Sequence, residues 1–200
     1  MLDLLAGLRT AGVATDEIFL TDHRIEPIAS CSACVAAGCC GIEDDFGALM
    51  DRLYAADLVL VGTPLYWYGP SGQLKLFLDR WSCLLDLAEE RFRDRMRGKR
   101  AVIVIAQGER GFYEAGACLQ MLDWTFRYLE MPVTGRIIVV GHARGDYASD
   151  PDQRKAVSEA AAALAVGQSV DLQPPWFHLG YQPGTRLGGI FYPEDGSATE

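Results

Sequence analysis

Three short apolar runs without polar alternation constrain the fold of this chain more than any other feature. They are residues 57–62, 101–106 and 137–140. Such runs are typical of strands that are buried on both faces of a parallel sheet. A fourth, weaker run at residues 17–20 indicates a shorter strand. Because helical patterns alternate with these runs, we predict an α/β fold, with a doubly wound parallel sheet in a three-layer α/β/α arrangement.

The predicted helices have recognisable ends and apolar faces. Ser71 begins a helix whose apolar residues share one face. Asp150 followed by Pro151 is typical of a helix start, and this helix continues to about residue 166. The other predicted helices cover residues 1–8, a stretch that starts at Asp44 or Asp45 and carries Phe46, Leu49, Met50 and Leu53, and residues 113–129.

An aromatic loop follows the first apolar run. The run ends at Thr63 and Pro64, and Tyr66, Trp67 and Tyr68 come directly after. Open α/β sheets bind their ligands at the carboxyl ends of the strands, so a planar ligand would suit this loop. Residue type alone favours the other interpretation, in which the three rings pack as core.

A second loop follows the next apolar run and contains Gln107, Gly108 and Glu109. Consecutive parallel strands with right-handed crossovers usually neighbour each other, so this loop is predicted to lie beside the aromatic one. Its glycines would let backbone amides approach a ligand closely. An ordinary turn would also account for them.

The aromatic loop and the helix after it resemble a known signature. Residues 63–68, 72–75 and 77–80 are similar to a motif of the NADPH-dependent FMN reductase and iron–sulfur flavoprotein group, within the flavodoxin-like proteins. The similarity extends from about Ile25 to about Ala165. It implies that Trp67 or Tyr68 lies against the isoalloxazine ring of FMN and that Lys75, Asp79 and Arg80 are structural. The cofactor-binding residues implied are Thr63, Pro64, Leu65, Tyr66, Trp67, Tyr68, Gly69, Gln107, Gly108 and Glu109.

The amino end departs from the pattern of that group. Its members open with a strand and a phosphate-binding loop before the first helix, and this strand is central in the sheet order 2-1-3-4-5. Here the helix over residues 1–8 comes first. The prediction is therefore a flavodoxin-like sheet whose first strand is missing. Either Met1 is an internal methionine of a longer reading frame, which we favour, or the chain is a shortened member that binds flavin weakly or not at all.

Four cysteines lie in residues 31–40. The resemblance aligns Cys31, Cys34 and Cys40 with three cysteines of the group and places Ile28 where a further cysteine should be. A [4Fe–4S] cluster needs four thiolates, so Cys39 would have to supply the fourth. Zinc usually takes two separated ligand pairs. Buried thiols are the favoured interpretation, a metal site and a redox-active thiol pair remain open, and no metal ligand is assigned.

Composition and charge restrict the partners. The formal net charge of −9, with basic residues scattered among acids, argues against a nucleic-acid partner. No stretch approaches the roughly 18 apolar residues of a membrane span, and no signal peptide is visible at the start. Six cysteines without a secretion signal indicate thiols rather than disulfides. We predict a cytoplasmic protein without a membrane partner.

The chain divides into a flavodoxin-like FMN reductase domain over residues 1–167 and an extension over residues 168–200 that is rich in Pro, Gly and aromatic residues. The three histidines, His23, His142 and His178, form no metal spacing. Five aromatic residues of the extension are predicted to pack on the domain or on a second subunit: Trp176, Phe177, Tyr181, Phe191 and Tyr192.

The resemblance implies an FMN-dependent NAD(P)H oxidoreductase of the flavin or quinone reductase type, which passes electrons through FMN to a small-molecule acceptor. It also implies a homodimer or homotetramer. The flavin would carry the chemistry, in keeping with the lack of an obvious acid, base or nucleophile in the sequence. Two alternatives remain: an iron–sulfur flavoprotein that carries electrons, and an interaction protein that keeps the fold without a cofactor. The sequence does not choose between NADH and NADPH.

Overall fold

The computed structural model describes residues 1–28, 40–108, 115–143, 145–172, 186–187 and 190–191. Within these residues the secondary structure alternates between strands and helices, as the sequence predicts. No helix in this part of the chain is both long enough and apolar enough to cross a lipid bilayer.

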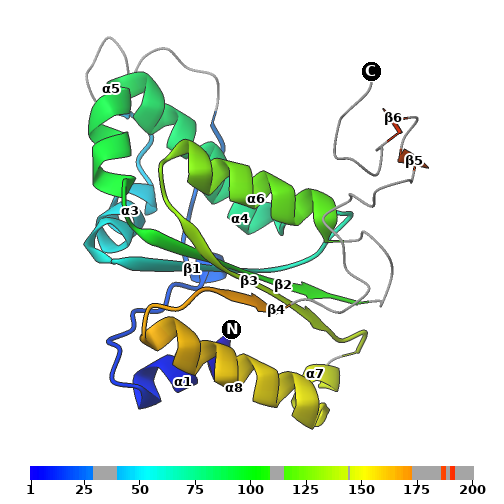
Figure 1. Ribbon diagram of the computed structural model, residues 1–200. Helices are drawn as coiled ribbons and strands as arrows, with labels where there is room; N and C mark the ends of the chain where they lie inside the picture. The colour runs from blue at the N-terminus through cyan, green and yellow to red at the C-terminus, as the bar shows by residue number, and fades with distance from the viewer. Residues whose placement is uncertain (29–39, 109–114, 144, 173–185, 188–189, 192–200) are drawn as a thin grey trace.

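Four parallel strands form the central sheet (Figure 1). Strands β1 (Leu58–Pro64), β2 (Arg100–Gln107) and β3 (Val133–Val140) confirm the three apolar runs. The short strand β4 (Val170–Leu172) pairs with β3 and was not predicted. The strand order is β1-β2-β3-β4, so each strand lies beside its neighbour in sequence. A two-stranded antiparallel pair, β5 (Arg186–Leu187) and β6 (Ile190–Phe191), is separate from this sheet.

Helices cover both faces of the sheet (Figure 1), which confirms the predicted three layers. The larger core lies on one face and the smaller core on the other. The first face carries α3 (Phe46–Ala55), α4 (Gly72–Asp79), α5 (Trp81–Met96) and α6 (Gly116–Tyr128). The second carries α1 (Leu2–Thr10), the short α7 (Asp146–Ser149) and α8 (Pro151–Ala165).

Side-chain caps fix the starts of two predicted helices. Ser71 Oγ accepts a hydrogen bond from the Leu74 N–H at 3.3 Å at the start of α4. Asp150 accepts from the N–H groups of Asp152 and Gln153 at the start of α8. Capping of this kind satisfies amide groups that have no partner inside the helix. Both positions were predicted from the sequence.

The strand predicted at residues 17–20 is wrong. The chain there joins no sheet, and a 3-10 helix, η1 (Leu20–Asp22), begins at Leu20. Side chains hold this segment instead: the Arg52 guanidinium donates to the Asp16 carboxylate at 2.6 and 2.8 Å and to the Glu17 carbonyl at 2.7 Å. A cavity separates the segment from β1, so the segment has no adjacent strand with which to form a ladder.

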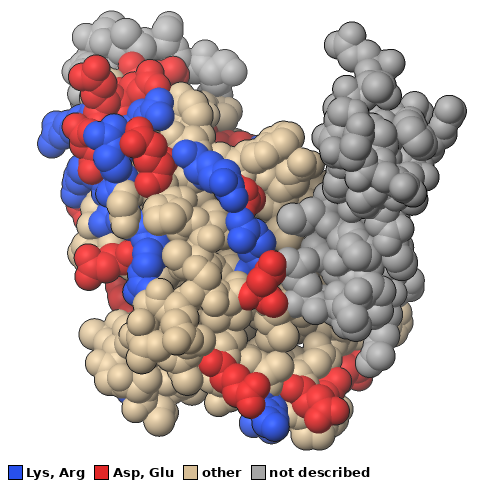
Figure 2. All heavy atoms as spheres, in the orientation of Figure 1, with Lys and Arg blue, Asp and Glu red and all other residues tan. Residues whose placement is uncertain are grey.

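Charged side chains of both signs mix on the face shown in Figure 2. Around the carboxyl end of α5, Arg93 pairs with Glu89 and Glu130, and Arg97 pairs with Asp94 and Glu130. Ion pairs as exposed as these contribute little to stability, typically below about 1 kcal/mol each.

Candidate functional site

The aromatic loop at the carboxyl end of β1 is a tight two-residue turn. The Tyr66 N–H donates to the Gly69 carbonyl at 2.9 Å, and the Gly69 N–H donates to the Tyr66 carbonyl at 3.0 Å. Trp67 and Tyr68, between them, have φ angles of 50° and 65°. These are left-handed conformations, which cost an L-residue about 1–2 kcal/mol each, and turns of this type usually carry Asn-Gly. The turn is therefore strained.

Hydrogen bonds at both ends of the turn maintain this strained geometry. The Leu65 N–H donates to the Ala106 carbonyl of β2 at 2.8 Å. Thr63 is buried, and its Oγ1 accepts from the Ser71 N–H at 2.9 Å while donating to the Pro64 carbonyl at 2.8 Å. Strained backbone persists where its surroundings over-determine it, and such sites cluster where ligands bind.

The turn displays its three aromatic side chains to solvent. Tyr66 is 61% exposed, Trp67 is 96% exposed and Tyr68 is 62% exposed. The interpretation of these rings as core, which residue type favoured, does not fit. Neighbouring exposed aromatic side chains on a fixed backbone are a feature of ligand or partner sites. The strained backbone and the exposed aromatic side chains are thus two separate features that are typical of a binding site.

The predicted second loop begins beside this turn. Gln107 is buried at the end of β2, and its carbonyl accepts from the Gly141 N–H at 2.9 Å. A Cβ atom at Gly108 would lie 3.7 Å from His142 Nδ1. Glu109 lies outside the described residues. The carboxyl ends of β1, β2 and β3 therefore meet at one edge of the sheet.

The predicted site residues of the aromatic loop fall into two groups. Thr63, Leu65 and Gly69 support the turn through hydrogen bonds, and Pro64 ends β1. The three aromatic residues project from it. His142 was not among the predicted site residues, although its position just after the third apolar run was a signal that could have found it, since carboxyl strand ends share one edge.

The helix after the turn ends at a buried arginine. Arg80 is 1% exposed, its Nη1–H donates to the Glu26 carbonyl at 3.0 Å, and the same group forms an ion pair with the Asp44 carboxylate. Its guanidinium also lies 4.6 Å from the centroid of the Phe46 ring. Burial acts to raise the pKa of Asp44, but hydrogen bonds from the Glu26 N–H, Arg80 and the Phe46 N–H outweigh it and lower that pKa. This pair joins α4 to the start of α3.

Arg80 also reaches the cysteine-containing segment. Its Nη2–H donates to Cys40 Sγ at 3.6 Å. Cys31, Cys34 and Cys39 lie outside the described residues, so their interpretation stays open. The described residues contain no group of three or more His, Cys, Asp or Glu side chains that could hold a metal ion. Cys118 is buried in α6, and burial raises the pKa of its thiol to about 11, so it is protonated at neutral pH.

Comparison with known proteins gives a consistent result. The sequence pattern of the family described as NADPH-dependent FMN reductase matches residues 1–145. The putative NAD(P)H-dependent FMN-containing oxidoreductase YwqN of Bacillus subtilis is 29% identical over 169 residues, which are 84% of this chain and 91% of that protein.

Two further relatives match shorter stretches. The iron–sulfur flavoprotein MJ1083 of Methanocaldococcus jannaschii is 33% identical over 39% of this chain and 40% of that protein. The FMN-dependent NADH:quinone oxidoreductase of Methylocella silvestris is 34% identical over 62% of this chain and 58% of that protein. Each match thus covers less than two thirds of the relative.

Solved structures share the architecture. The Trp repressor binding protein from Bacillus subtilis is 28% identical, with a TM-score of 0.52, and the alignment covers 60% of this chain and 75% of that one. RosB, solved with its bound intermediate 8-demethyl-8-formylriboflavin-5′-phosphate, is 16% identical with a TM-score of 0.65, covering 82% and 70%. The likeness to RosB supports the fold alone.

Proposed function

The chain belongs to the NADPH-dependent FMN reductase family, which confirms the predicted resemblance, and on that premise we propose that it passes electrons from NAD(P)H through FMN to a flat, small-molecule acceptor of the quinone class. Members and relatives of this family are NAD(P)H-dependent FMN oxidoreductases, as the sequence predicted. The choice of acceptor is the finer part of the proposal.

One observation carries the proposal: a strained, hydrogen-bonded turn holds Trp67 almost fully exposed at the carboxyl end of a parallel strand. The isoalloxazine ring of FMN is flat and largely apolar, so exposed aromatic rings on a fixed backbone fit it. Stacking on such a ring adds about 0.5–1.5 kcal/mol beyond the area that it buries. These residues therefore fit the ring portion of FMN.

The residues of the site would hold and orient the flavin. Trp67 and Tyr68 would stack against the ring, and the Gln107–Gly108 end of β2 would lie at its other side. The hydrogen bonds of Thr63 and Leu65 would keep the turn from relaxing when the ring is absent, so little ordering would be needed on binding. When bound, FMN supplies the acceptance of hydride and the release of electrons.

A flat acceptor suits this arrangement because Tyr66, the exposed ring of the turn that is not assigned to the flavin, would leave an aromatic side chain beside the bound ring. A quinone would then take the place that NAD(P)H leaves, in alternating steps. The relative from Methylocella silvestris is named as a quinone oxidoreductase, and this supports the same class of acceptor. A dimer or tetramer, in which a neighbouring subunit completes the site, stays a prediction.

The test is oxidation of NADH or NADPH by the purified chain with FMN and a soluble quinone. We expect a rate that needs protein, FMN and quinone together. The Trp67→Ala variant should need about tenfold more FMN for half the maximal rate. Trp124→Ala, which removes a 63%-exposed tryptophan from α6, is the matched control and should behave as the unchanged chain does. A rate no higher than that of FMN alone would refute the proposal.

A second candidate is electron transfer through an iron–sulfur cluster beside the flavin. It is favoured by the hydrogen bond from buried Arg80 to Cys40 Sγ, since such bonds to cluster ligands tune reduction potential, and by the relative from Methanocaldococcus jannaschii. Ile28 in place of a cysteine argues against it. The test is the iron and sulfide content after anaerobic reconstitution. About four of each per chain, lost in the Cys40→Ser variant, would support an iron–sulfur cluster. If the chain retains neither iron nor sulfide, the cluster is excluded.

A further inference from the structure

The imidazole of His142 is exposed at the carboxyl edge of the sheet, two residues after β3. A Cβ atom at Gly108 would lie 3.7 Å from its Nδ1, so the imidazole covers the first residue after β2. No group in the described part of the chain forms a hydrogen bond or an ion pair with this imidazole. Its ring nitrogens are therefore available to a ligand that binds at this edge.

Hydrogen bonds fix the backbone on both sides of His142. The Gly141 N–H donates to the Gln107 carbonyl at 2.9 Å, which joins the loop to β2. The Ala143 N–H donates to the Asp146 carboxylate at 2.7 Å, and the Asp146 N–H donates to the Ala143 carbonyl at 3.2 Å. Because the loop is already fixed, a ligand that contacts the imidazole would have to order little of the chain.

The strand order places His142 and the aromatic turn on opposite sides of Gly108. Strand β2 lies between β1 and β3, and its last residue, Gln107, pairs with Val140 at the end of β3. The turn after β1 and the loop after β3 are therefore separated by two strand spacings, about 10 Å. This separation is comparable to the long dimension of three fused six-membered rings. A flat tricyclic ring that stacks on Trp67 can thus extend across Gly108 to His142.

The two ends of the isoalloxazine ring differ in polarity, and an imidazole suits only one of them. One end is an apolar dimethylbenzene, and the other is a pyrimidine with two carbonyl oxygens. The exposed rings of Trp67 and Tyr68 offer apolar area for stacking, but the pyrimidine oxygens lose hydrogen bonds to water unless the protein supplies donors. An imidazole carries an N–H donor in both its neutral and its protonated form. His142 therefore fits the pyrimidine end.

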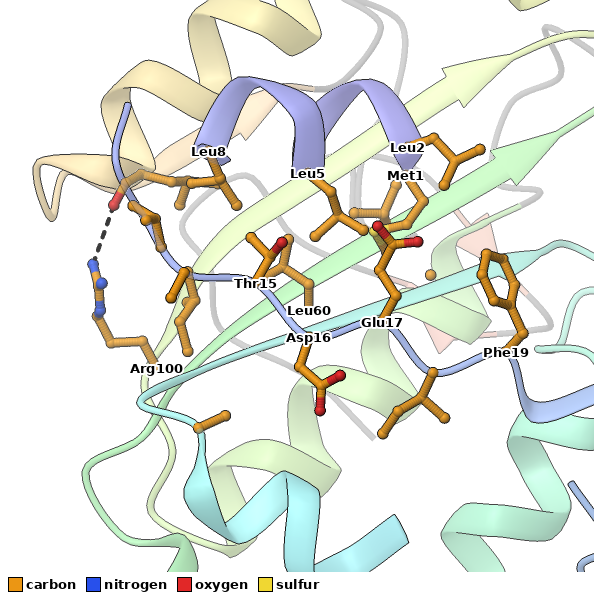
Figure 3. Close-up of a pocket in the computed structure, with 18 of the residues that line it drawn as sticks. Met1, Leu2, Leu5, Leu8, Thr15, Asp16, Glu17, Phe19, Leu60 and Arg100 are labelled. Atoms are coloured by element: carbon orange, nitrogen blue, oxygen red, sulfur yellow. Dashed lines mark hydrogen bonds between the residues drawn. The ribbon is translucent and has the colours of Figure 1, made fainter. Parts of the chain in front are cut away.

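The other side of the turn leaves room for the ribityl phosphate chain of FMN. Strand β1 has β2 on one side, and on the other side lies a cavity that is lined in part by Met1, Leu5 and Leu60 (Figure 3). This cavity extends to Pro64 at the carboxyl end of β1. The flexible chain and its phosphate can extend to that side, away from β3. This arrangement brings the ring, rather than the phosphate, to His142.

From these features we propose that His142 donates a hydrogen bond to the pyrimidine end of bound FMN, and that this bond is stronger to the reduced cofactor than to the oxidised one. The inference rests on the proposed function. Reduced flavin carries a negative charge that N1 shares with the neighbouring carbonyl oxygen, and hydrogen bonds to charged groups are roughly twice as strong as those between neutral groups. His142 thus orients the ring and raises its reduction potential.

The test compares the unchanged chain with His142→Ala and with His142→Gln, which keeps an N–H donor. Fluorescence quenching measures the binding of oxidised FMN, and anaerobic equilibration with a reference dye measures the reduction potential of the bound flavin. For His142→Ala we expect about threefold weaker binding of oxidised FMN and about 30-fold weaker binding of reduced FMN. This tenfold difference corresponds to a potential that is lower by about 30 mV. His142→Gln should recover most of the affinity for oxidised FMN.

Riboflavin, which lacks the phosphate, distinguishes a contact to the ring from a contact to the phosphate. His142→Ala should weaken the binding of riboflavin by the same factor as the binding of FMN. A loss with FMN alone would assign His142 to the phosphate and overturn the inference. Equal reduction potentials in His142→Ala and the unchanged chain would also overturn it.

These results separate the inference from the proposed function. The side chain of His142 is exposed, so both variants should unfold at the same urea concentration as the unchanged chain. If Trp67→Ala weakens FMN binding and His142→Ala changes neither affinity nor potential, the inference fails and the proposed function stands. If none of the folded proteins binds FMN, both are overturned.

Discussion

The aromatic turn and Arg80 belong to one short signature, residues 63–80, yet they are opposites in structure. Trp67 is 96% exposed on a strained backbone, and Arg80 is 1% exposed in a regular helix end with an ion-pair partner. The strained backbone of the turn lowers the stability of the fold, and the rings of the turn stay exposed. Arg80, in contrast, connects three separate stretches of the chain. A single sequence motif therefore combines an exposed aromatic surface with an anchor for the fold, and the two should separate under mutation.

The largest effect is expected where Arg80 is removed. Arg80→Met leaves the Asp44 carboxylate buried without its partner, which should lower the free energy of unfolding by about 3–5 kcal/mol. Urea denaturation of the chain without FMN measures this. Arg127→Met is the matched control, because that arginine is exposed and its pair with Asp123 should matter by less than about 1 kcal/mol. Equal losses of unfolding free energy in the two variants would show that Arg80 stabilises the fold no more than an exposed arginine does.

Relief of the strained turn should act in the opposite direction. Replacing Trp67 with Asn and Tyr68 with Gly supplies the residues that this turn prefers, so the free energy of unfolding should rise by about 1–2 kcal/mol. The same variant should lose FMN affinity, because both stacking rings are gone. Urea denaturation and flavin titration of one preparation measure the two effects. A loss of stability would show that the rings contribute to the fold after all.

Acid should weaken the ion pair between Arg80 and Asp44 and so lower the stability of the fold. The pKa of Asp44 is lowered in the folded chain, so its contribution to stability is complete above the ordinary pKa of about 3.9 and is lost as the pH falls through the lower folded value. Between about pH 5 and pH 2 the urea midpoint should therefore fall more steeply for the unchanged chain than for Asp44→Asn. Parallel curves would contradict this assignment.

The smallest change in stability and in FMN affinity is expected from a substitution at Lys75, which lies between the aromatic turn and Arg80 in the sequence. Lys75 forms an exposed ion pair with Asp79 one helical turn away. Pairs of this kind contribute about 0.3–0.5 kcal/mol, so Lys75→Ala should change both the free energy of unfolding and the FMN affinity very little. A loss of several-fold in FMN affinity would instead place Lys75 in the binding site.

Local sequence patterns predicted most helices and strands. Where the predictions failed, the structure depends on contacts between residues that are distant in the sequence. The helices at Ser71 and Asp150 begin where they were predicted, and both residues cap them, because capping depends on a few neighbouring residues. Residues 17–20 have the composition of a strand but no ladder partner, and β4, with only three residues, is too short to give a periodic signal.

The position of the aromatic turn could be predicted from the sequence, but its exposure and backbone conformation could not. The position of the turn after a buried strand follows from pattern and resemblance. The exposure of Trp67 contradicts what residue type favours, and left-handed φ angles at two adjacent aromatic residues have no local signal. The resemblance implied a structural role for Arg80, but its burial had no local signal, since arginine is mostly exposed and its partner Asp44 lies far away in the sequence.

The most direct test of this account is a titration of the purified chain with FMN, followed by the quenching of flavin fluorescence. We predict saturable binding to the unchanged chain and to Trp124→Ala, and a dissociation constant about tenfold higher for Trp67→Ala, with unfolding curves of all three proteins that agree within about 0.5 kcal/mol. Equal affinity of Trp67→Ala and the unchanged chain, or no binding by any of the three folded proteins, would contradict the claim that the aromatic turn holds the flavin.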